Sequence, residues 1–278
     1  MSTVTISAKD ISKLRQATGA GMMDCRKALT ETNGDFEAAI DWLRKQGQKV
    51  AAKRSDREAN EGVVIAQTTA DNKTGFVVCV SCETDFVSKN EDFIAFGQSI
   101  ADAALKNDIK SLDELMNTTI GDLTVSQMVD DKLASIGEKI GVTKFERIEA
   151  EYVASYIHGA YRIGVLVGLD KPNAEVGKDV AMQIAALNPV AIDADSVPAD
   201  VIDREKAIIM DVMKEDPKMA GKPDDMLSKI ADGKLKAFFK ENTLAMQAFV
   251  KDSSKTVADY LTENDKVKVT AFRRVALG

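Results

Sequence analysis

The second half of this chain repeats a sequence pattern of its first half, and the repeat limits the folds open to it. Residues 142–148 (VTKFERI) resemble residues 269–275 (VTAFRRV). Upstream of each stretch stands a Thr-Val pair, at 124–125 in one half and at 256–257 in the other. Internal similarity of this kind indicates a duplicated structural unit.

Each half is predicted to contain a β-hairpin, a helix and a later third strand. In the first half, apolar runs at 62–68 and 75–80 are joined by residues 71–73, which is typical of a hairpin. The helix expected at 91–106 has an apolar face made by Phe93, Phe96, Ile100 and Ala104.

The second half has corresponding runs at 151–157 and 162–169. The helix that follows has an apolar face made by Val176, Val180, Ile184 and Leu187. We therefore predict an α+β fold of two related core subdomains with small antiparallel sheets. The strands are too few and too short to predict their order.

The first 50 residues are predicted to form a compact unit of three helices. Ser7 can cap the first helix with Asp10 three residues on, and residues 18–21 (TGAG) end that helix. Asn33-Gly34 ends the second helix, and the third carries apolar residues at helical spacing. Three short helices around a small core resemble a ubiquitin-associated (UBA) domain.

Extra material between about 190 and 250 interrupts the second half. Two amphipathic segments separated by a turn at 217–223 predict an antiparallel helical hairpin. Its outer apolar face would need cover, which a partner chain can provide. The predicted boundaries are 1–54 for the helical domain, 55–150 for the first core subdomain, 151–190 with 250–278 for the second, and 191–249 for the hairpin.

Composition favours a soluble, globular, cytoplasmic protein. Of the 278 residues 45% are apolar and 29% charged, and no apolar run approaches the ~20 residues of a membrane span. Residues 1–10 do not resemble a secretory signal. Three cysteines, few and odd in number, suit a reducing compartment.

The formal net charge of −7 makes nucleic-acid binding an unlikely role. One local cluster is basic, and we interpret it as a solvated linker rather than an RNA site because no aromatic residues are interleaved with it. The cluster comprises Arg44, Lys45, Lys49, Lys53, Arg54 and Arg57.

The stretch 82–89 (CETDFVSK) places Phe86, between Asp85 and Val87, where the chain should turn over the end of a sheet. Large apolar residues usually lie within periodic segments rather than in the turn between them. An apolar ring beside a carboxylate could enter another protein's pocket. The alternative, a ring folded back onto its own core, is about equally consistent with the spacing.

Two blocks of this sequence resemble bacterial translation elongation factor Ts, the nucleotide-exchange partner of the GTPase elongation factor Tu. They are residues 14–29 (LRQATGAGMMDCRKAL) and 82–89, in the family's order. Similar stretches at 155–159 and 162–167 extend the resemblance over nearly the whole chain. Some members continue into a C-terminal helical module. This chain ends at Gly278, so we expect a smaller interface.

The resemblance implies a set of partner-binding residues. Asp85 and Phe86 would enter the GTPase near its magnesium and phosphate site. Thr84 and Val87, which flank that pair, are also predicted contacts. The predicted contacts elsewhere in the chain are Met22, Met23, Arg15, Arg26, His158, Phe249 and Val250.

Within that set, the Met pair would grip a helix of the nucleotide domain, with Arg15 and Arg26 at its rim. Adjacent helical side chains diverge, so at least one Met should be exposed. The resemblance also makes the hairpin at 191–249 a coiled-coil arm for self-association. The chain departs from the family's usual Glu, Asn and Pro at Cys79, Ser81 and Ala248.

Enzymatic function is not predicted. His158 is the sole histidine, residues 19–21 (GAG) lack the context of a phosphate loop, and the Cys79–Cys82 pair is expected to be structural. We predict no cofactor, metal or direct nucleotide binding. The expected function is guanine-nucleotide exchange on elongation factor Tu, and the alternative is an adaptor that binds proteins through the UBA-like bundle.

Overall fold

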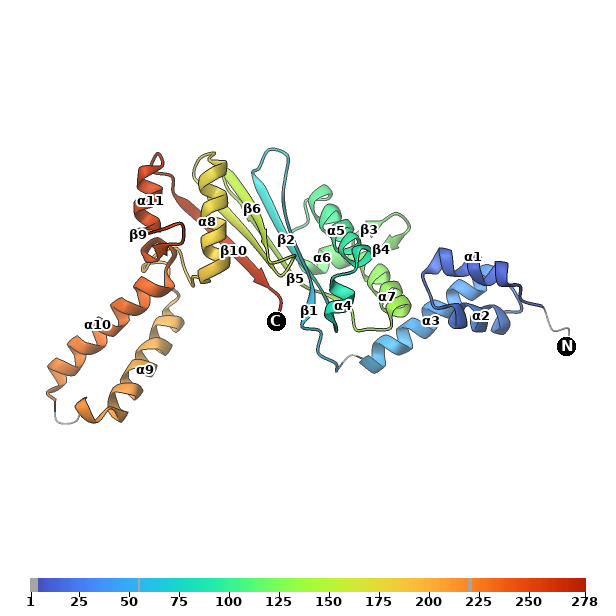
Figure 1. The fold of residues 1–278 in the computed structure, drawn as a ribbon, viewed down its shortest axis with the longest axis horizontal. Coiled ribbons are helices and arrows are strands. Elements are labelled where there is room, and N and C mark those ends of the chain that lie inside the picture. The colour runs from blue at the N-terminus through green and yellow to red at the C-terminus, as the bar shows by residue number, and fades with distance from the viewer. Residues whose placement is uncertain (1–4, 55, 220–221) are drawn as a thin grey trace.

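Two three-stranded antiparallel sheets lie at the centre of the described part of the chain (Figure 1). The computed structural model describes residues 5–54, 56–219 and 222–278. The first sheet has the order β1-β2-β5 and the second β10-β7-β6. Their strands are β1 (Glu61–Thr68), β2 (Thr74–Cys82), β5 (Gly141–Glu149), β6 (Tyr152–His158), β7 (Ile163–Leu169) and β10 (Val269–Ala276).

The predicted duplication is confirmed by the topology of these sheets. In each unit a hairpin is followed by a helix, and the late third strand pairs with the second strand of the hairpin. That pairing supplies the strand order that the sequence left undecided. The α+β class and both predicted hairpins are also confirmed.

The sheets pack face to face, and their outer faces are covered by helices. In β2, Val77 and Cys79 point into the layer between the sheets, whereas Phe76 and Val78 point to the outer core, as alternation in a strand requires. The first sheet is covered by α5 (Glu91–Lys106) and, beyond it, α7 (Val125–Ile136); α8 (Ala174–Leu187) covers the second.

The duplicated Thr-Val pairs begin corresponding helices. Thr124 caps α7, where its hydroxyl accepts a hydrogen bond from the backbone N–H of Gln127 at 3.2 Å. Thr256 caps α11 (Val257–Glu263) in the same way, with Asp259 at 3.1 Å. In both cases the third side chain of the helix bonds back to the threonine N–H, which completes a capping box.

Residues 5–54 form the expected helical unit, which we call the bundle. It consists of α1 (Ala8–Thr18), α2 (Met22–Glu31) and α3 (Phe36–Arg54). The predicted capping box of Ser7 and Asp10 is present, and Gly19 ends α1 with a φ of 70°. Leu14, Cys25 and Leu29 fill its core.

The basic stretch predicted as a linker is instead helical up to residue 54, where α3 ends; Arg57 lies beyond the helix. Its residues are mostly good helix formers such as Arg, Lys, Gln and Ala. The continued helix runs beside α7, and Arg44 Nε lies 3.6 Å from Asp131 Oδ1 (Figure 1). Ser55, at the predicted domain boundary, and the side chains of Lys53 and Arg54 lie outside the described residues.

The inserted hairpin projects from the end of the molecule opposite the bundle, and we call it the arm (Figure 1). It consists of α9 (Ala199–Glu215) and α10 (Asp224–Asn242). At its base lie a two-stranded hairpin and a short 3-10 turn. The smaller elements are α4 (Asp85–Ser88), α6 (Leu112–Asn117), β3 (Thr119–Ile120), β4 (Leu123–Thr124), η1 (Pro217–Met219), η2 (Leu244–Met246), β8 (Ala248–Phe249) and β9 (Asp252–Thr256). Across the described ranges, every helix is too short or too polar to cross a membrane.

The close approach of the two sheets predicts a steric test at Gly164. A Cβ there would lie 2.7 Å from Val64 Cγ1 and 2.9 Å from Val77 Cγ2. We expect Gly164→Val to lower the free energy of unfolding by about 1–3 kcal/mol, because it overpacks the layer between the sheets. Urea denaturation followed by circular dichroism measures the change.

The matched control is Gly233→Ala in α10, where an added Cβ meets open space. This substitution should stabilise the chain by about 0.5–1 kcal/mol, through helix propensity alone. Equal effects of the two substitutions would contradict a tight layer between the sheets.

Candidate functional site

Phe86 projects outward from a short helical turn at the end of β2. The turn comprises residues 84–88, including α4, and we call it the Phe86 turn. Its side chain is 85% exposed, far more than an ordinary apolar residue. The alternative in which this ring packs back onto its own core is therefore wrong.

The Phe86 turn is fixed from below by side chains of its own subdomain. Glu138 accepts two hydrogen bonds from Thr84, from the backbone N–H at 3.1 Å and from the hydroxyl at 2.8 Å. Glu83, just before the turn, accepts from the N–H of Lys139 at 2.6 Å. Val87 packs against the outer core of the first sheet. The exposed ring thus stands on a well-anchored support.

Asp85 supplies negative charge beside the ring. Lys89 Nζ donates a hydrogen bond to Asp85 Oδ2 at 2.6 Å. That bond, together with the lysine's positive charge, holds the pKa of Asp85 below its usual value. Asp85 is therefore ionised at neutral pH, so the turn presents an apolar ring and a carboxylate together.

Comparison of the two halves identifies α4 as an insertion. Seven residues, 83–89, separate the end of β2 from Asn90, the cap of α5. Three residues, 170–172, separate the end of β7 from Asn173, the corresponding cap of α8. The difference of four equals the length of α4. Because the second unit folds without it, the insertion is not required by the shared fold, and a functional role is favoured.

A second exposed apolar patch lies on the bundle. Met22 and Met23 begin α2 and are 58% and 73% exposed. The sequence predicted that at least one would be exposed, and both are. Arg15 and Arg26 are exposed as well, as a rim would require. The inward side of the same helix is taken by Cys25, Ala28 and Leu29.

His158 ends strand β6 and is exposed, beside Tyr156, whose hydroxyl lies 3.0 Å from its Nδ1. The hairpin loop that follows crosses to the first sheet. Tyr161 accepts a hydrogen bond there from the N–H of Val64 at 2.8 Å, and Arg162 pairs with Glu61 at 3.0 Å. The loop beside His158 therefore adjoins β1, a strand that α4 also contacts.

The structure separates the predicted contacts Phe249 and Val250. Phe249 is only 3% exposed, and its ring stacks on Tyr260 with centroids 4.2 Å apart. Direct contact of this ring with a partner was therefore the wrong expectation, because the ring belongs to the core of the second subdomain. Val250 is 46% exposed and remains available.

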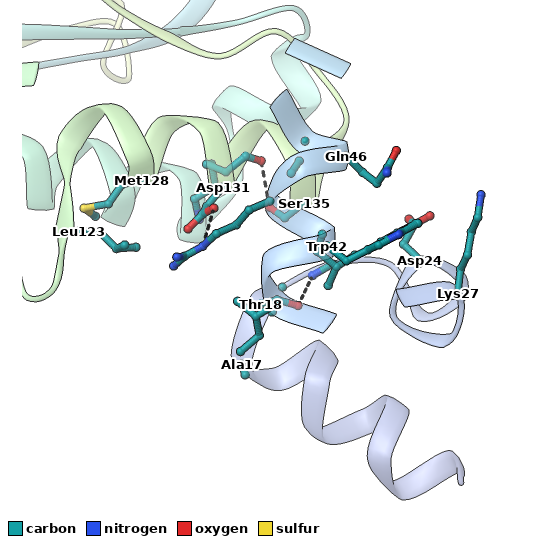
Figure 2. Close-up of a pocket in the computed structure, with 18 of the residues that line it drawn as sticks. Ala17, Thr18, Asp24, Lys27, Trp42, Gln46, Leu123, Met128, Asp131 and Ser135 are labelled. Carbon is teal, nitrogen blue, oxygen red and sulfur yellow. Dashed lines mark hydrogen bonds and ion pairs between the residues drawn. The ribbon is translucent and has the colours of Figure 1, made fainter. Parts of the chain in front are cut away.

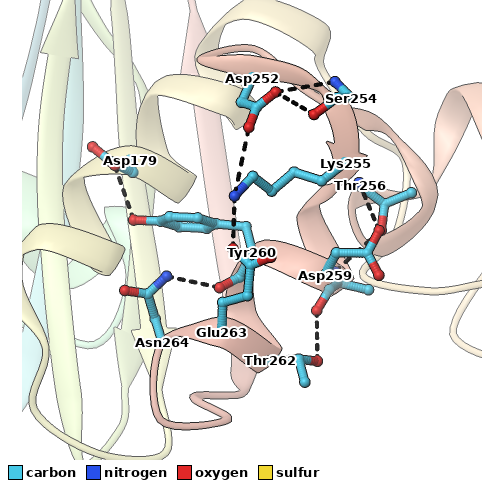
Figure 3. Close-up of polar contacts among 11 residues, drawn as sticks. Asp179, Asp252, Ser254, Lys255, Thr256, Asp259, Tyr260, Thr262, Glu263 and Asn264 are labelled. Carbon is cyan, nitrogen blue, oxygen red and sulfur yellow. Dashed lines mark hydrogen bonds and ion pairs between the residues drawn. The ribbon is translucent and has the colours of Figure 1, made fainter.

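A buried polar network near that hairpin was not predicted from the sequence. Tyr260 donates a hydrogen bond to buried Asp179 at 2.9 Å, which Figure 3 shows, and Lys251 Nζ lies 2.5 Å from the same carboxylate. Burial, with Asp179 adding to it, raises the pKa of Tyr260. A charged residue on a largely apolar helix face, between Val176 and Val180, was the available signal.

A cavity of about 680 Å³ lies beside the contact between the bundle and α7 (Figure 2). It lies between Trp42 of α3 and Met128 of α7, with Thr18 and Ser135 on its wall. None of the predicted contact residues lines it. The bundle therefore contacts the first core subdomain along one side of α3, and an open space remains between α7 and another side of α3.

The described residues contain no group of three or more His, Cys, Asp or Glu arranged to hold a metal. Cys79 and Cys82 are both buried and point to opposite faces of the first sheet. Burial raises the pKa of the Cys82 thiol to about 12, so it is protonated at neutral pH. Their surroundings fit the structural role expected for the pair.

Exposed apolar clusters supported by a rigid framework mark surfaces for protein interaction. Fold and site together are typical of an α+β protein with surfaces suited to contact with another protein. A family profile described as Elongation factor TS matches residues 83–278. The elongation factor Ts of Christiangramia forsetii is 48% identical over 277 residues, covering 98% of this chain and 99% of the relative.

Two further relatives support the same assignment. Elongation factor Ts of Amoebophilus asiaticus is 46% identical and that of Flavobacterium psychrophilum 45% identical. Each comparison covers 99% of this chain. It covers 100% of the Amoebophilus asiaticus protein and 99% of the Flavobacterium psychrophilum protein. The chain belongs to the elongation factor Ts family, and its role therefore lies in the elongation stage of protein biosynthesis.

Proposed function

We propose that this chain promotes the release of GDP from elongation factor Tu by binding and stabilising the nucleotide-free GTPase. The observation that carries the proposal is the exposed ring of Phe86 on an anchored, inserted turn. Membership of the elongation factor Ts family supports the choice of partner.

The mechanism requires no bond chemistry from this chain. In a GTPase, magnesium and the nucleotide phosphates hold the switch and phosphate-binding loops together. A ring inserted among those loops would stabilise a displaced arrangement in which phosphate binding is weak. Asp85, ionised and paired with Lys89, would enter the same region beside the ring. By linkage, bound GDP must weaken the binding of this chain by the same factor.

The remaining contact residues divide into two groups in this proposal. Met22 and Met23, with Arg15 and Arg26 at their rim, would anchor the bundle on the nucleotide domain. His158 and Val250 would make smaller contacts. Thr84 and Val87 would act mainly by holding the Phe86 turn, since their side chains contact the chain's own subdomain.

The second candidate function is an adaptor that binds a ubiquitin-like or other protein through the bundle. It is favoured by the exposed Met22–Met23 patch at the start of α2, a helix that lies away from the sheets in Figure 1. An adaptor of this kind does not use the Phe86 turn. Changes at Phe86 therefore separate the two functions.

The proposal also includes self-association through the arm. Ile208, Val212 and Met226 of its two helices are exposed large apolar residues that a second copy could cover.

We expect Phe86→Ala to slow stimulated GDP release by about thirtyfold, because truncation of a central interface aromatic costs about 2 kcal/mol or more. Release of fluorescent GDP from elongation factor Tu, followed by stopped flow, measures the rate. Leu187→Ala, which removes an exposed apolar side chain from α8, is the matched control and should leave the rate unchanged. A Phe86→Ala variant with the parent's rate would exclude the wedge.

We expect Met22→Ala combined with Met23→Ala to weaken binding to nucleotide-free elongation factor Tu by roughly five- to thirtyfold, since the pair would lose its apolar contact. Calorimetric titration gives the affinity, and circular dichroism checks that the bundle still folds. An unaltered dissociation constant would remove this patch from the mechanism.

We expect Ile208→Lys to shift any dimer of the chain towards monomer, because it places a charge in the proposed contact between arms. Sedimentation velocity over a concentration series measures the mass. Thr262→Lys on α11 is the control for added charge. Self-association that is equally strong in the parent and in Ile208→Lys would contradict the role of the arm.

A further inference from the structure

One helix, α7, supports both the bundle and the Phe86 turn. Its buried face, made by Val125, Val129 and Leu133, packs into the outer core of the first subdomain. Lys132 Nζ lies 5.0 Å from the centre of the Phe96 ring of α5, which adds a cation–π contact. The helix is therefore fixed to the sheet that carries the Phe86 turn.

The bundle meets α7 at a point where the two helices approach very closely. A Cβ on Gly47 of α3 would lie 2.5 Å from the Cβ of Ala134 and 3.6 Å from the backbone oxygen of Asp130. Only a glycine allows this approach without a shift of one helix. The Arg44–Asp131 ion pair, drawn in Figure 2, lies beside the same contact.

The C-terminal end of α7, a few residues beyond this contact, leads directly to the Phe86 turn. Gly137 ends the helix with a φ of 78°, and its N–H donates to Leu133 at 2.7 Å. The reversal brings the next residue, Glu138, under Thr84, where one carboxylate accepts both the backbone and the hydroxyl hydrogen of that residue. Bonds to a charged acceptor are stronger than neutral ones.

From these contacts we propose that α7 sets the position of the Phe86 turn relative to the Met22–Met23 patch. Glu138 and Gly47 are its positioning residues. The inference rests on the proposed function, since it explains how two distant patches engage one GTPase together. A fixed spacing between them avoids the entropy cost of ordering the bundle and the turn separately at each encounter.

The two positioning residues make separable contributions. Loss of the Glu138 carboxylate frees Thr84 and lets the turn reorient, but leaves the contact between α3 and α7 in place. A large side chain at Gly47 pushes the bundle away from α7, and the neighbouring cavity gives it room to move. That change leaves the hydrogen bonds of Thr84 untouched.

The first experiment compares Glu138→Ala and Glu138→Gln in the full chain. Amide hydrogen exchange at Thr84, measured by NMR, should be at least about tenfold faster in Glu138→Ala, and GDP release from elongation factor Tu should be several-fold slower. Glu138→Gln keeps an oxygen for the hydroxyl of Thr84 but places an amide group against its N–H, so both effects should be intermediate. Glu146→Ala, which removes a surface ion pair with Arg273, is the matched control and should change neither.

The second experiment compares Gly47→Leu with Gly233→Leu, the same substitution at a helix position with open space. In Gly47→Leu, ¹⁵N relaxation should show the bundle tumbling more independently of the core, and affinity for nucleotide-free elongation factor Tu should fall at least fivefold. The Thr84 amide should keep the parent's protection. Gly233→Leu should change none of the three.

Parent-like protection of Thr84 in Glu138→Ala would overturn the role of Glu138. Faster amide exchange with an unchanged rate of GDP release would overturn it equally. For Gly47→Leu, unchanged tumbling or unchanged affinity would overturn the role of the α3–α7 contact. If Phe86→Ala itself leaves GDP release unchanged, the proposed function fails, while the Thr84 and tumbling measurements still decide whether α7 holds the two patches.

Discussion

The tight packing of the two sheets against each other is the constraint on which the rest of the structure depends. Gly75 and Gly164 allow it, because a side chain on either would collide with valines or leucines of the opposite sheet. With both faces buried, β2 cannot shift or twist freely. The Phe86 turn follows directly after the end of that strand. The exposed ring is therefore held in place by the rigid, buried layer between the sheets.

Duplication explains how a binding element could be added to this framework. The two units share strand pairing, helix caps and the order of elements, but only the first carries the four residues of α4. The second unit instead contains the arm, which is inserted between α8 and the two-stranded hairpin of β8 and β9. Stable cores tolerate insertions at loops because loop closure costs little additional entropy. Each copy has thus kept its core and acquired a different projecting element.

Much of the fold was predictable from the sequence, since period-two and period-3.6 patterns identify strands, helices and their buried faces. Helix α5 was predicted with the bounds it has, and the repeated Thr-Val pairs mark real helix starts. Alternation reveals which side chains face inward but not which strands are neighbours, so strand order required the structure. Phe249 was misjudged because the burial of its ring depends on stacking against Tyr260, a contact that the sequence pattern does not reveal. Glu138 was missed because its bond partner, Thr84, is far away in the sequence.

The proposed mechanism requires Phe86 to enter the phosphate-binding region of a GTPase. Site-specific photocrosslinking tests it directly, with a benzoylphenylalanine at position 86 of the full chain and nucleotide-free elongation factor Tu. The account predicts crosslinks to the phosphate-binding and switch loops, and their loss when excess GDP is added. Crosslinks confined to other regions of the GTPase, or a yield that GDP does not reduce, would contradict it.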